Sequence, residues 1–333
     1  MAMLKTPYLL FLGDAHDGLA AKTAAGVAFW RPESCVGQLR LPGCKADLKL
    51  PDKTVEAAAA EGAKTLVVGV ANRGGVINEE WIPVLVQALE RGMDLASGLH
   101  RRLAEVPALK AAAERYGRQI FDVRHPTREF EVANGKPRSG KRLLTVGTDC
   151  SIGKMFTSLA LEREMRRRKM KADFRATGQT GILIAGDGIS VDAVVADFIS
   201  GSVEWLAPAN EPDHWDLIEG QGSLFHASYA GVSLGLLHGA QPTALVVCHE
   251  PTRTHMRGLP HYPLPPLKTC IETNVQAARL TSPEVTVVGL AINTAALDAA
   301  AAEKVLKQTA DQFGLPCVDP VRTGVGPIVD RLV

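Results

Sequence analysis

The sequence predicts an α/β protein with two domains, each built around a parallel sheet. Short apolar runs alternate with helical patterns along the whole chain, which is typical of parallel α/β layers. The chain has 333 residues, more than a single hydrophobic core usually accommodates. A polar segment rich in turn-forming residues, 134–141, interrupts the alternation. We therefore expect an N-terminal domain over residues 1–138 and a C-terminal domain over residues 139–333.

The expected elements follow this alternation in order. In the first domain, strands are predicted at Tyr8–Leu12, Thr65–Val70, Asp94–Gly98 and Gln119–Val123, with helices such as Glu79–Arg91 and Pro107–Tyr116 between them. The second domain is expected to begin with the strand Arg142–Val146 and the helix Gly153–Arg168. Its further strands are predicted at Asp173–Ala176, Asp216–Glu219, Ala244–Cys248, Val285–Ile292 and Pro316–Asp319, with helices at Val191–Ile199 and Leu297–Phe313.

Composition and charge exclude several classes of function. Hydrophobic residues make up 46% of the chain and charged residues 22%, the balance of an ordinary globular protein. The formal net charge is +1, so we expect neither a nucleic-acid nor a membrane partner. The six cysteines are scattered, without zinc-ligand spacing, and the apolar run before Gly13 lacks a signal-peptide pattern. The sequence thus predicts a cytoplasmic protein that acts on a small molecule and holds no metal.

The segment after the predicted strand Arg142–Val146 has the context of a phosphate-binding P-loop. Gly147 and Gly153 permit backbone angles that turn successive N–H groups toward an anion. The N-terminus of the following helix adds positive potential, and Lys154 adds a full charge. A tight strand-to-helix connection is the alternative interpretation. The residues expected to bind a cofactor phosphate are Gly147, Thr148, Asp149, Cys150, Ser151, Ile152, Gly153, Lys154 and Met155.

This loop departs from the common G-x-x-x-x-G-K-[ST] pattern in two ways. It has one extra residue between the glycines, a length that resembles the loop of dethiobiotin synthetase and related P-loop ligases. Met155 also stands where a Ser or Thr hydroxyl normally binds Mg²⁺. A thioether is a poor ligand for a hard cation, so the sequence favours phosphate binding without efficient Mg-nucleotide hydrolysis.

A glycine-rich segment, 178–190, contains four glycines and an acid among small residues. We interpret it as a loop whose backbone approaches a ligand, with Gln179, Thr180 and Asp187 as polar contacts. A flexible turn followed by a helix that Ser190 caps is the alternative.

A second polar segment follows the predicted strand Asp216–Glu219. Because the carboxyl ends of parallel strands line the ligand crevice of such sheets, Glu219 should lie near the P-loop. Gln221, Ser223 and His226 come directly afterwards and are candidates for the same site. A surface strand end is the alternative.

The remaining candidates for binding substrate lie in loops. Arg253 offers a planar fork of donors that suits a carboxylate. The surrounding segment, 249–255, does not favour zinc, because Pro251 breaks the helix that an H-E-x-x-H site needs. A loop after the strand Thr65–Val70 has the small residues expected near a crevice, although it also suits a plain connection. Its candidate residues are Asn72, Gly74 and Gly75.

The motifs Gly147–Met155, Gly178–Gly181 with Ala185–Gly188, and Ile218–His226 resemble those of the DgcN-like family, long described as a domain of unknown function. The resemblance extends over nearly the whole chain. It implies a Rossmann-like N-terminal domain beside a P-loop domain of the NTPase type. It also implies transfer of an acetyl group from acetyl-CoA to the amino group of D-glutamate, in D-amino-acid catabolism. A P-loop without its magnesium hydroxyl fits this activity, since it can grip the phosphates of coenzyme A, and we expect a homo-oligomer.

The expected chemistry is direct attack of the deprotonated substrate amine on the thioester. Such an amine is mostly protonated near neutral pH, so a base is needed, and Glu219 is the first candidate, before Asp187 and His226. A route in which Cys150 first accepts the acetyl group is an alternative, because a thiol at a helix N-terminus ionises more readily. Two other functions stay open: an ATP-dependent ligase or kinase of the dethiobiotin-synthetase type, and a non-catalytic sensor of a nucleotide or coenzyme A.

Overall fold

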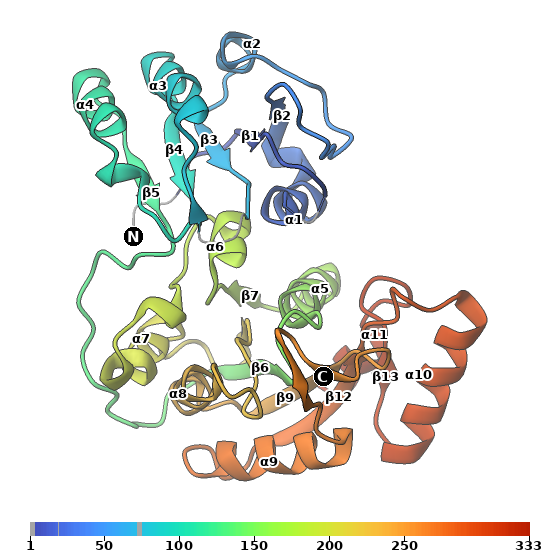
Figure 1. Cartoon of the computed structure of the whole chain (residues 1–333). Coiled ribbons are helices and arrows are strands. Elements are labelled where there is room, and N and C mark those ends of the chain that lie inside the picture. The colour runs from blue at the N-terminus through green and yellow to red at the C-terminus, as the bar shows by residue number, and fades with distance from the viewer. Residues whose placement is uncertain (1–3, 19, 72–74) are drawn as a thin grey trace. The chain divides into compact units, whose positions relative to one another are not determined.

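The computed structural model describes residues 4–18, 20–71 and 75–333, which form two compact units (Figure 1). Unit 1 comprises the chain up to Thr127 together with Gly178–Ala193, and unit 2 comprises Arg128–Thr177 and Val194–Val333. This division differs from the expected ranges 1–138 and 139–333 at two places. Residues 128–138 belong to unit 2. Residues 178–193 belong to unit 1 because their helix packs on the first helix of the chain, and because Leu4 N–H donates to Gly186 O.

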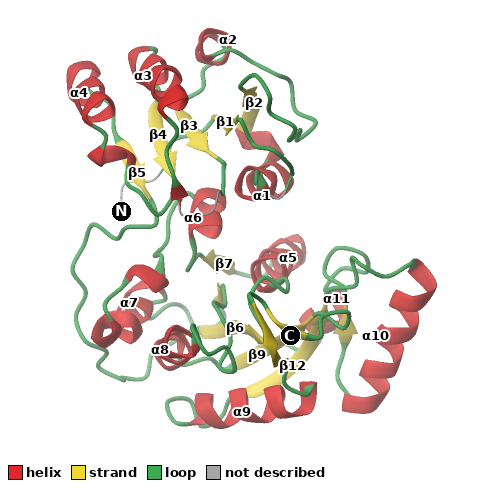
Figure 2. Ribbon diagram, viewed as in Figure 1, coloured by secondary structure: helices red, strands yellow, loops and turns green. Residues whose placement is uncertain are grey.

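The sheet of unit 1 has five parallel strands in the order β2-β1-β3-β4-β5 (Figure 2). Their bounds are β1 Tyr8–Gly13, β2 Cys35–Arg40, β3 Thr65–Val68, β4 Asp94–Ser97 and β5 Ile120–Asp122. Every residue of β1, β3 and β4 is buried, as expected for inner strands covered on both faces. This explains why the first domain shows continuous apolar runs in its sequence rather than alternation.

Helices cover both faces of this sheet. They are α1 Lys22–Trp30, α2 Val55–Ala60, α3 Ile82–Glu90, α4 Pro107–Tyr116 and α6 Gln179–Ala185. A single core cluster joins α2, α3 and α4 to alternate residues of the strands, such as Leu9 and Phe11 of β1. The bounds of α4 agree with the sequence expectation, because Pro107 suits the first helical turn and Gly117 ends the helix in a left-handed conformation at φ 62°.

The sheet of unit 2 has six parallel strands in the order β13-β12-β9-β6-β8-β7. Their bounds are β6 Lys141–Gly147, β7 Ala172–Arg175, β8 Trp215–Ile218, β9 Ala244–His249, β12 Thr286–Ile292 and β13 Cys317–Val318. The central strand β6 pairs with β8 on one side and β9 on the other. The chain segments that follow these three strands therefore meet at one edge of the sheet, which is where the sequence places the P-loop and Glu219.

The helices of unit 2 and one antiparallel hairpin complete it (Figure 2). The helices are α5 Lys154–Arg167, α7 Ile199–Leu206, α8 Ala230–Ala240, α9 Leu267–Arg279, α10 Ala299–Phe313 and α11 Gly326–Val329, and the hairpin strands are β10 His255–Met256 and β11 Leu259–Pro263. Asp298 caps α10 by accepting from Ala301 N–H at 2.8 Å, and Gly314 ends the helix at φ 64°.

The sequence prediction for residues 178–199 is wrong. The segment expected to be a glycine-rich loop contains α6, because the apolar run Ile182–Ile184 is buried and Gly186 ends the helix in a left-handed conformation. The helix expected at Val191–Ile199 is instead two short 3₁₀ turns, Val191–Ala193 and Ala196–Phe198, and α7 begins only at Ile199. Ser190 does not cap a helix through its hydroxyl, which contacts the Asp192 carboxylate at 3.1 Å.

Arg138 joins the C-terminal ends of α7 and α8. Its guanidinium donates to Ala207 O beyond α7 and to Gly239 O within α8. We expect Arg138→Ala to lower the free energy of unfolding by about 2–3 kcal/mol, because helix-end carbonyls lose charged donors. Chemical denaturation would measure this, with the exposed Arg331→Ala as a control that changes little. Equal unfolding midpoints for both variants would contradict the role assigned to Arg138.

Candidate active site

The P-loop joins β6 to α5 and needs a glycine at its start. A side-chain Cβ on Gly147 would lie 2.4 Å from Cys248 O of the neighbouring strand, too close for any other residue. Further along, Ser151 and Gly153 have left-handed backbone angles, at φ 53° and φ 110°. These two positions turn the loop back into the N-terminus of α5, which directs backbone N–H groups toward the space that an anion would occupy.

Lys154 is the first residue of α5 and lies beneath the loop. Its side chain is buried, and Nζ donates to Asp149 O at 2.6 Å. Burial lowers the pKa of the Lys154 ammonium. A bound phosphate would stabilise its charged form, so the position of Lys154 favours binding of an anion at this loop.

Asp149 is fully buried, and its carboxylate is saturated with donors. Oδ1 accepts from Cys150 N–H at 2.7 Å, and Oδ2 accepts from Arg253 Nη1 at 2.7 Å and from Arg257 N–H at 2.8 Å. Arg253 also donates to Cys150 O at 2.7 Å and to Glu250 Oε2 at 2.6 Å. The carboxylate that Arg253 holds in this structure is thus a side chain of the P-loop itself.

The hydroxyls near the start of α5 make hydrogen bonds inside the protein. Thr157 Oγ1 donates to Gly153 O at 2.9 Å, and Ser158 Oγ donates to Ile218 O at 3.3 Å. Neither therefore replaces the hydroxyl that is absent at Met155, and the loop keeps its anion-binding backbone without that magnesium ligand.

Glu219 directly follows β8, the strand next to β6, and its side chain is only 4% exposed. Its Oε2 accepts from Thr177 N–H at 3.0 Å, and the Thr177 hydroxyl donates to Glu219 O at 2.6 Å. The next residue, Gly220, donates its N–H to Thr145 Oγ1 at 3.0 Å, and a Cβ there would lie 3.0 Å from Lys154 Cδ. The backbone after β8 is therefore packed against the stem of the P-loop lysine.

His226 is 2% exposed and its ring is held from both sides. Nδ1 accepts from Ser228 N–H at 3.1 Å, which leaves the proton on Nε2, and Nε2–H donates to Arg257 O at 3.1 Å. The ring also stacks on Tyr229, with 4.4 Å between centroids. Both nitrogens are engaged inside the protein, so neither is available in this arrangement to take a proton from a substrate.

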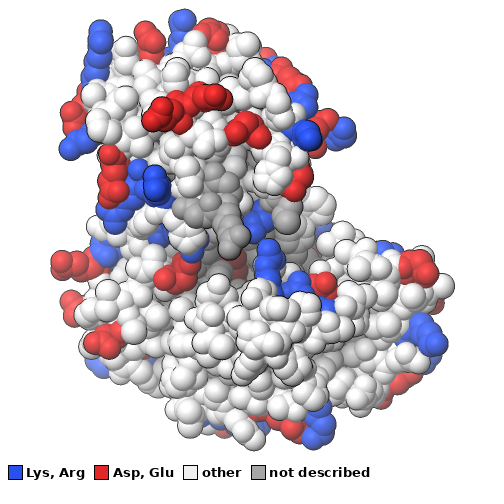
Figure 3. Space-filling model, viewed as in Figure 1, with Lys and Arg blue, Asp and Glu red and all other residues white. Residues whose placement is uncertain are grey.

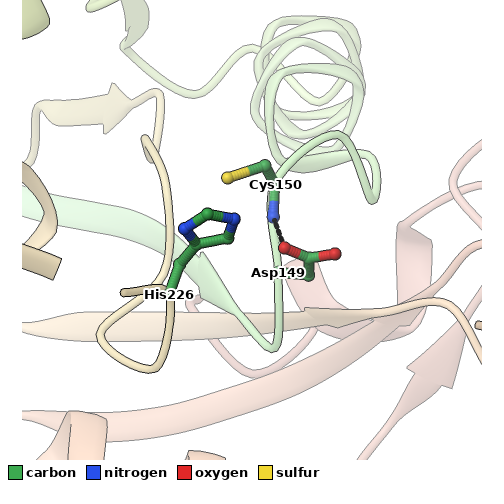
Figure 4. A group of neighbouring side chains, drawn as sticks. All are labelled: Asp149, Cys150 and His226. Carbon is green, nitrogen blue, oxygen red and sulfur yellow. Dashed lines mark hydrogen bonds between the residues drawn. The ribbon is translucent and has the colours of Figure 1, made fainter. Parts of the chain in front are cut away.

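Figure 4 shows that His226 faces the first part of the P-loop. One ring nitrogen of His226, the Cys150 sulfur and a carboxylate oxygen of Asp149 lie within 4.8 Å of one another. A Cys-His-Asp group is a possible metal site by residue type. Here, however, the Asp149 carboxylate already carries the Arg253 guanidinium, which would repel a cation. The arrangement therefore favours interpreting the group as a thiol beside an imidazole.

Three other candidates from the sequence, Asp187, Gln179 and Thr180, belong to unit 1. There, a Cβ on Gly98 would lie 2.8 Å from the Gln179 side chain. Asp187 Oδ1 accepts from its neighbouring Gly188 N–H at 2.8 Å.

The strand-end candidates of unit 1 have only one described member. Gly75 packs closely against the backbone of His100, because a Cβ on Gly75 would lie 2.5 Å from His100 N. Asn72 and Gly74 lie outside the described residues. In unit 2, Gln221 Nε2 donates to Thr177 Oγ1 at 3.1 Å, and Ser223 Oγ accepts from Phe225 N–H at 3.3 Å.

Sequence reasoning missed Thr177 and Arg257, and it considered His249 only within the segment that it rejected as a zinc site. Arg257 acts through backbone groups, which leave no signal in side-chain identity, whereas Thr177 uses both its backbone N–H and its hydroxyl. His249 ends β9 and its Nδ1 lies 3.0 Å from the Thr148 hydroxyl, while burial and Arg253 lower the pKa of the His249 imidazole. The one available signal for His249 is its place at the carboxyl end of a strand beside β6.

Family models match both halves of the chain. A model described as a Rossmann-like domain of unknown function, the N-terminal part of DUF1611, matches residues 39–126. The corresponding C-terminal model, described as a P-loop domain, matches residues 131–329. This chain belongs to the DUF1611 family. The α/β fold with a Rossmann-like N-terminal domain and a C-terminal P-loop domain is thereby confirmed, as is the family resemblance seen in the motifs.

Similar proteins match this chain over nearly its whole length. A protein of Tritonibacter scottomollicae named D-glutamate N-acetyltransferase is 57% identical over 330 residues, 99% of each chain. A protein of Pseudoalteromonas with the same name is 51% identical over 329 residues, again 99% of each. The crystal structure of a DUF1611 protein from Anabaena variabilis is 36% identical, with a TM-score of 0.87 over 98% of this chain and 99% of that one.

Acidic and basic side chains are intermixed over the visible surface in Figure 3, in line with the net charge of +1. No helix within the described ranges is long and apolar enough to cross a membrane.

Proposed function

We propose that this chain is an enzyme that transfers an acetyl group from acetyl-CoA to the amino group of D-glutamate, in the catabolism of D-amino acids. The observation that carries the proposal is the full-length identity of 57% and 51% to proteins named D-glutamate N-acetyltransferase. The P-loop and the segment after β8 support it, because they supply a buried lysine, a half-buried thiol and a buried acid at the same edge of the unit 2 sheet.

The P-loop supplies a binding site for the phosphates of coenzyme A. Its left-handed turn at Ser151 and Gly153 and the N-terminus of α5 favour an anion, and Lys154 provides the charge. Met155 and the internal hydrogen bond of Thr157 leave no hydroxyl for Mg²⁺ at this position. Binding of a phosphorylated cofactor without cleavage of a phosphate bond follows from these features.

Glu219 is the proposed base for the amine. It lies at the carboxyl end of β8, beside the P-loop strand, and is largely excluded from water. The amine of D-glutamate must lose a proton before it can attack a thioester, which is the task assigned to Glu219.

The first test measures cofactor choice. Calorimetry is expected to show binding of acetyl-CoA without magnesium, while ATP binds weakly with or without it. Lys154→Ala should weaken acetyl-CoA binding by about 10–100-fold, the effect of one charge-assisted contact. Lys304→Ala, on the exposed face of α10, is the matched control and should bind normally.

The second part of this test measures turnover. With D-glutamate and acetyl-CoA, release of the free thiol should accompany formation of the N-acetylated amino acid. If the protein bound Mg-ATP tightly, released phosphate and did not bind acetyl-CoA, the proposal would be wrong. A ligase or kinase of the dethiobiotin-synthetase type would then be the better interpretation. Binding without turnover of either cofactor would indicate a sensor.

A further inference from the structure

Cys150 combines three features that a P-loop residue does not need for phosphate binding. It is half-buried rather than enclosed, its sulfur lies within 4.8 Å of a ring nitrogen of His226, and it precedes the N-terminus of α5 (Figure 4). Its backbone N–H is fixed by Asp149 and its carbonyl by Arg253, so the position of the side chain is set from both ends. A thiol presented in this way at a helix N-terminus is typical of a nucleophile.

The charges around the sulfur oppose one another. Burial raises the pKa of the Cys150 thiol, and Asp149 adds to the increase. Lys154, Arg257 and Arg253 act in the other direction and lower it. The three cations thus offset part of the cost of a buried thiolate, which the thiol needs as it forms a bond to carbon.

His226 lies beside this thiol, with one ring nitrogen within 4.8 Å of the sulfur. The ring is held in place, because Nδ1 accepts from Ser228 N–H and Nε2–H donates to Arg257 O. A buried imidazole and three cations around one half-buried thiol form a polar environment that stabilises negative charge as it develops on the sulfur. This grouping favours a covalent route over the direct attack expected from the sequence.

We propose that Cys150 carries the acetyl group as a thioester between acetyl-CoA and the amino acid, an inference that rests on the proposed function. In the first step, Sγ bonds to the acetyl carbon, the bond from that carbon to the CoA sulfur breaks, and the thiol proton passes to the CoA thiolate. In the second step, the amine nitrogen bonds to the acetyl carbon and the bond to Sγ breaks. Of the two protons that the ammonium loses, one leaves through Glu219 to solvent and the other returns to Sγ.

The test is mass spectrometry of the full-length protein after incubation with acetyl-CoA and no acceptor. One added acetyl group should be found on the peptide that contains Cys150, and addition of D-glutamate should remove it and yield the N-acetylated product. Cys150→Ala should show no adduct and should lose activity by about 10³-fold or more. Cys44→Ser, which alters another half-buried thiol, should retain both the adduct and the activity.

A second measurement does not depend on any variant. If a covalent intermediate forms, wild-type protein should incorporate labelled coenzyme A into acetyl-CoA when no acceptor is present. Wild-type turnover with neither exchange nor adduct would overturn the role of Cys150 and leave the acetyltransferase proposal intact. Absence of all turnover with D-glutamate would instead overturn the proposed function. Near-normal activity of Cys150→Ala would likewise restore direct attack.

Discussion

Replacing Glu219 with glutamine is expected to lower kcat for acetyl transfer by about 10²–10⁴-fold while the affinity for acetyl-CoA changes little. Glutamine has the same shape, and its amide oxygen can still accept the hydrogen bond from Thr177 N–H that the carboxylate accepts at 3.0 Å. What it loses is the ability to take a proton from the amine. The effect should therefore appear in the chemical step rather than in binding of the cofactor.

Steady-state kinetics, together with calorimetry of acetyl-CoA binding, would measure this separation. The acid limb of the wild-type pH profile should disappear in Glu219→Gln, because the group that must be deprotonated is absent. If Cys150 carries the acetyl group, the same variant should also accumulate the acetylated enzyme, since its discharge needs the deprotonated amine.

Glu162 provides a matched control for this substitution. It is also 4% exposed, and its Oε1 accepts a backbone N–H, that of Phe174, at 3.1 Å. It lies on α5 and pairs with Arg166 at 3.0 Å, so Glu162→Gln should keep normal kcat. A near-normal kcat for Glu219→Gln would exclude Glu219 as the base.

Most inner strands and the P-loop were predictable because local sequence specifies them, whereas β2 and the hairpin β10–β11 were not predicted. A fully buried parallel strand such as β1 needs an uninterrupted apolar run, and a strand followed by two glycines and a lysine has few structural interpretations. The helix α6 was not predictable in the same way. Its glycines suggested a loop, but burial of Ile182–Ile184 against the rest of unit 1 outweighs their low helix propensity.

Part of the candidate site also followed from the sequence. The carboxyl ends of parallel strands line the ligand crevice of such sheets, and this rule places Glu219 beside the P-loop because β8 and β6 are neighbours in one parallel sheet. The partner of Arg253 did not follow, because the sequence suggested an external carboxylate whereas the structure pairs it with Asp149, 104 residues earlier in the chain. Such a pairing depends on the hairpin formed by β10 and β11, which brings Arg257 N–H to the same carboxylate.

The Asp149–Arg253 pair leads to the second prediction of large effect. Arg253→Met should lower the free energy of unfolding by about 3–5 kcal/mol, because the fully buried Asp149 carboxylate would be left without the guanidinium that pairs with it. Methionine retains much of the apolar length of the side chain, so the loss would come mainly from the missing charge and hydrogen bonds. Chemical denaturation would measure it, and acetyl-CoA binding should weaken as well because Arg253 also holds Cys150 O in the loop.

Two controls separate the charge from the packing. Arg102→Met removes one member of an exposed pair, with Glu105 at 3.9 Å, and should change stability little because water screens that pair. The double variant Asp149→Asn with Arg253→Met removes both charges together, and it should recover a substantial part of the stability lost by Arg253→Met alone. If the single Arg253 variant were as stable as wild type, the guanidinium would not be what stabilises the buried carboxylate. The donors from Cys150 and Arg257 would then suffice to hold Asp149, and the shape of the P-loop would be set by its backbone alone.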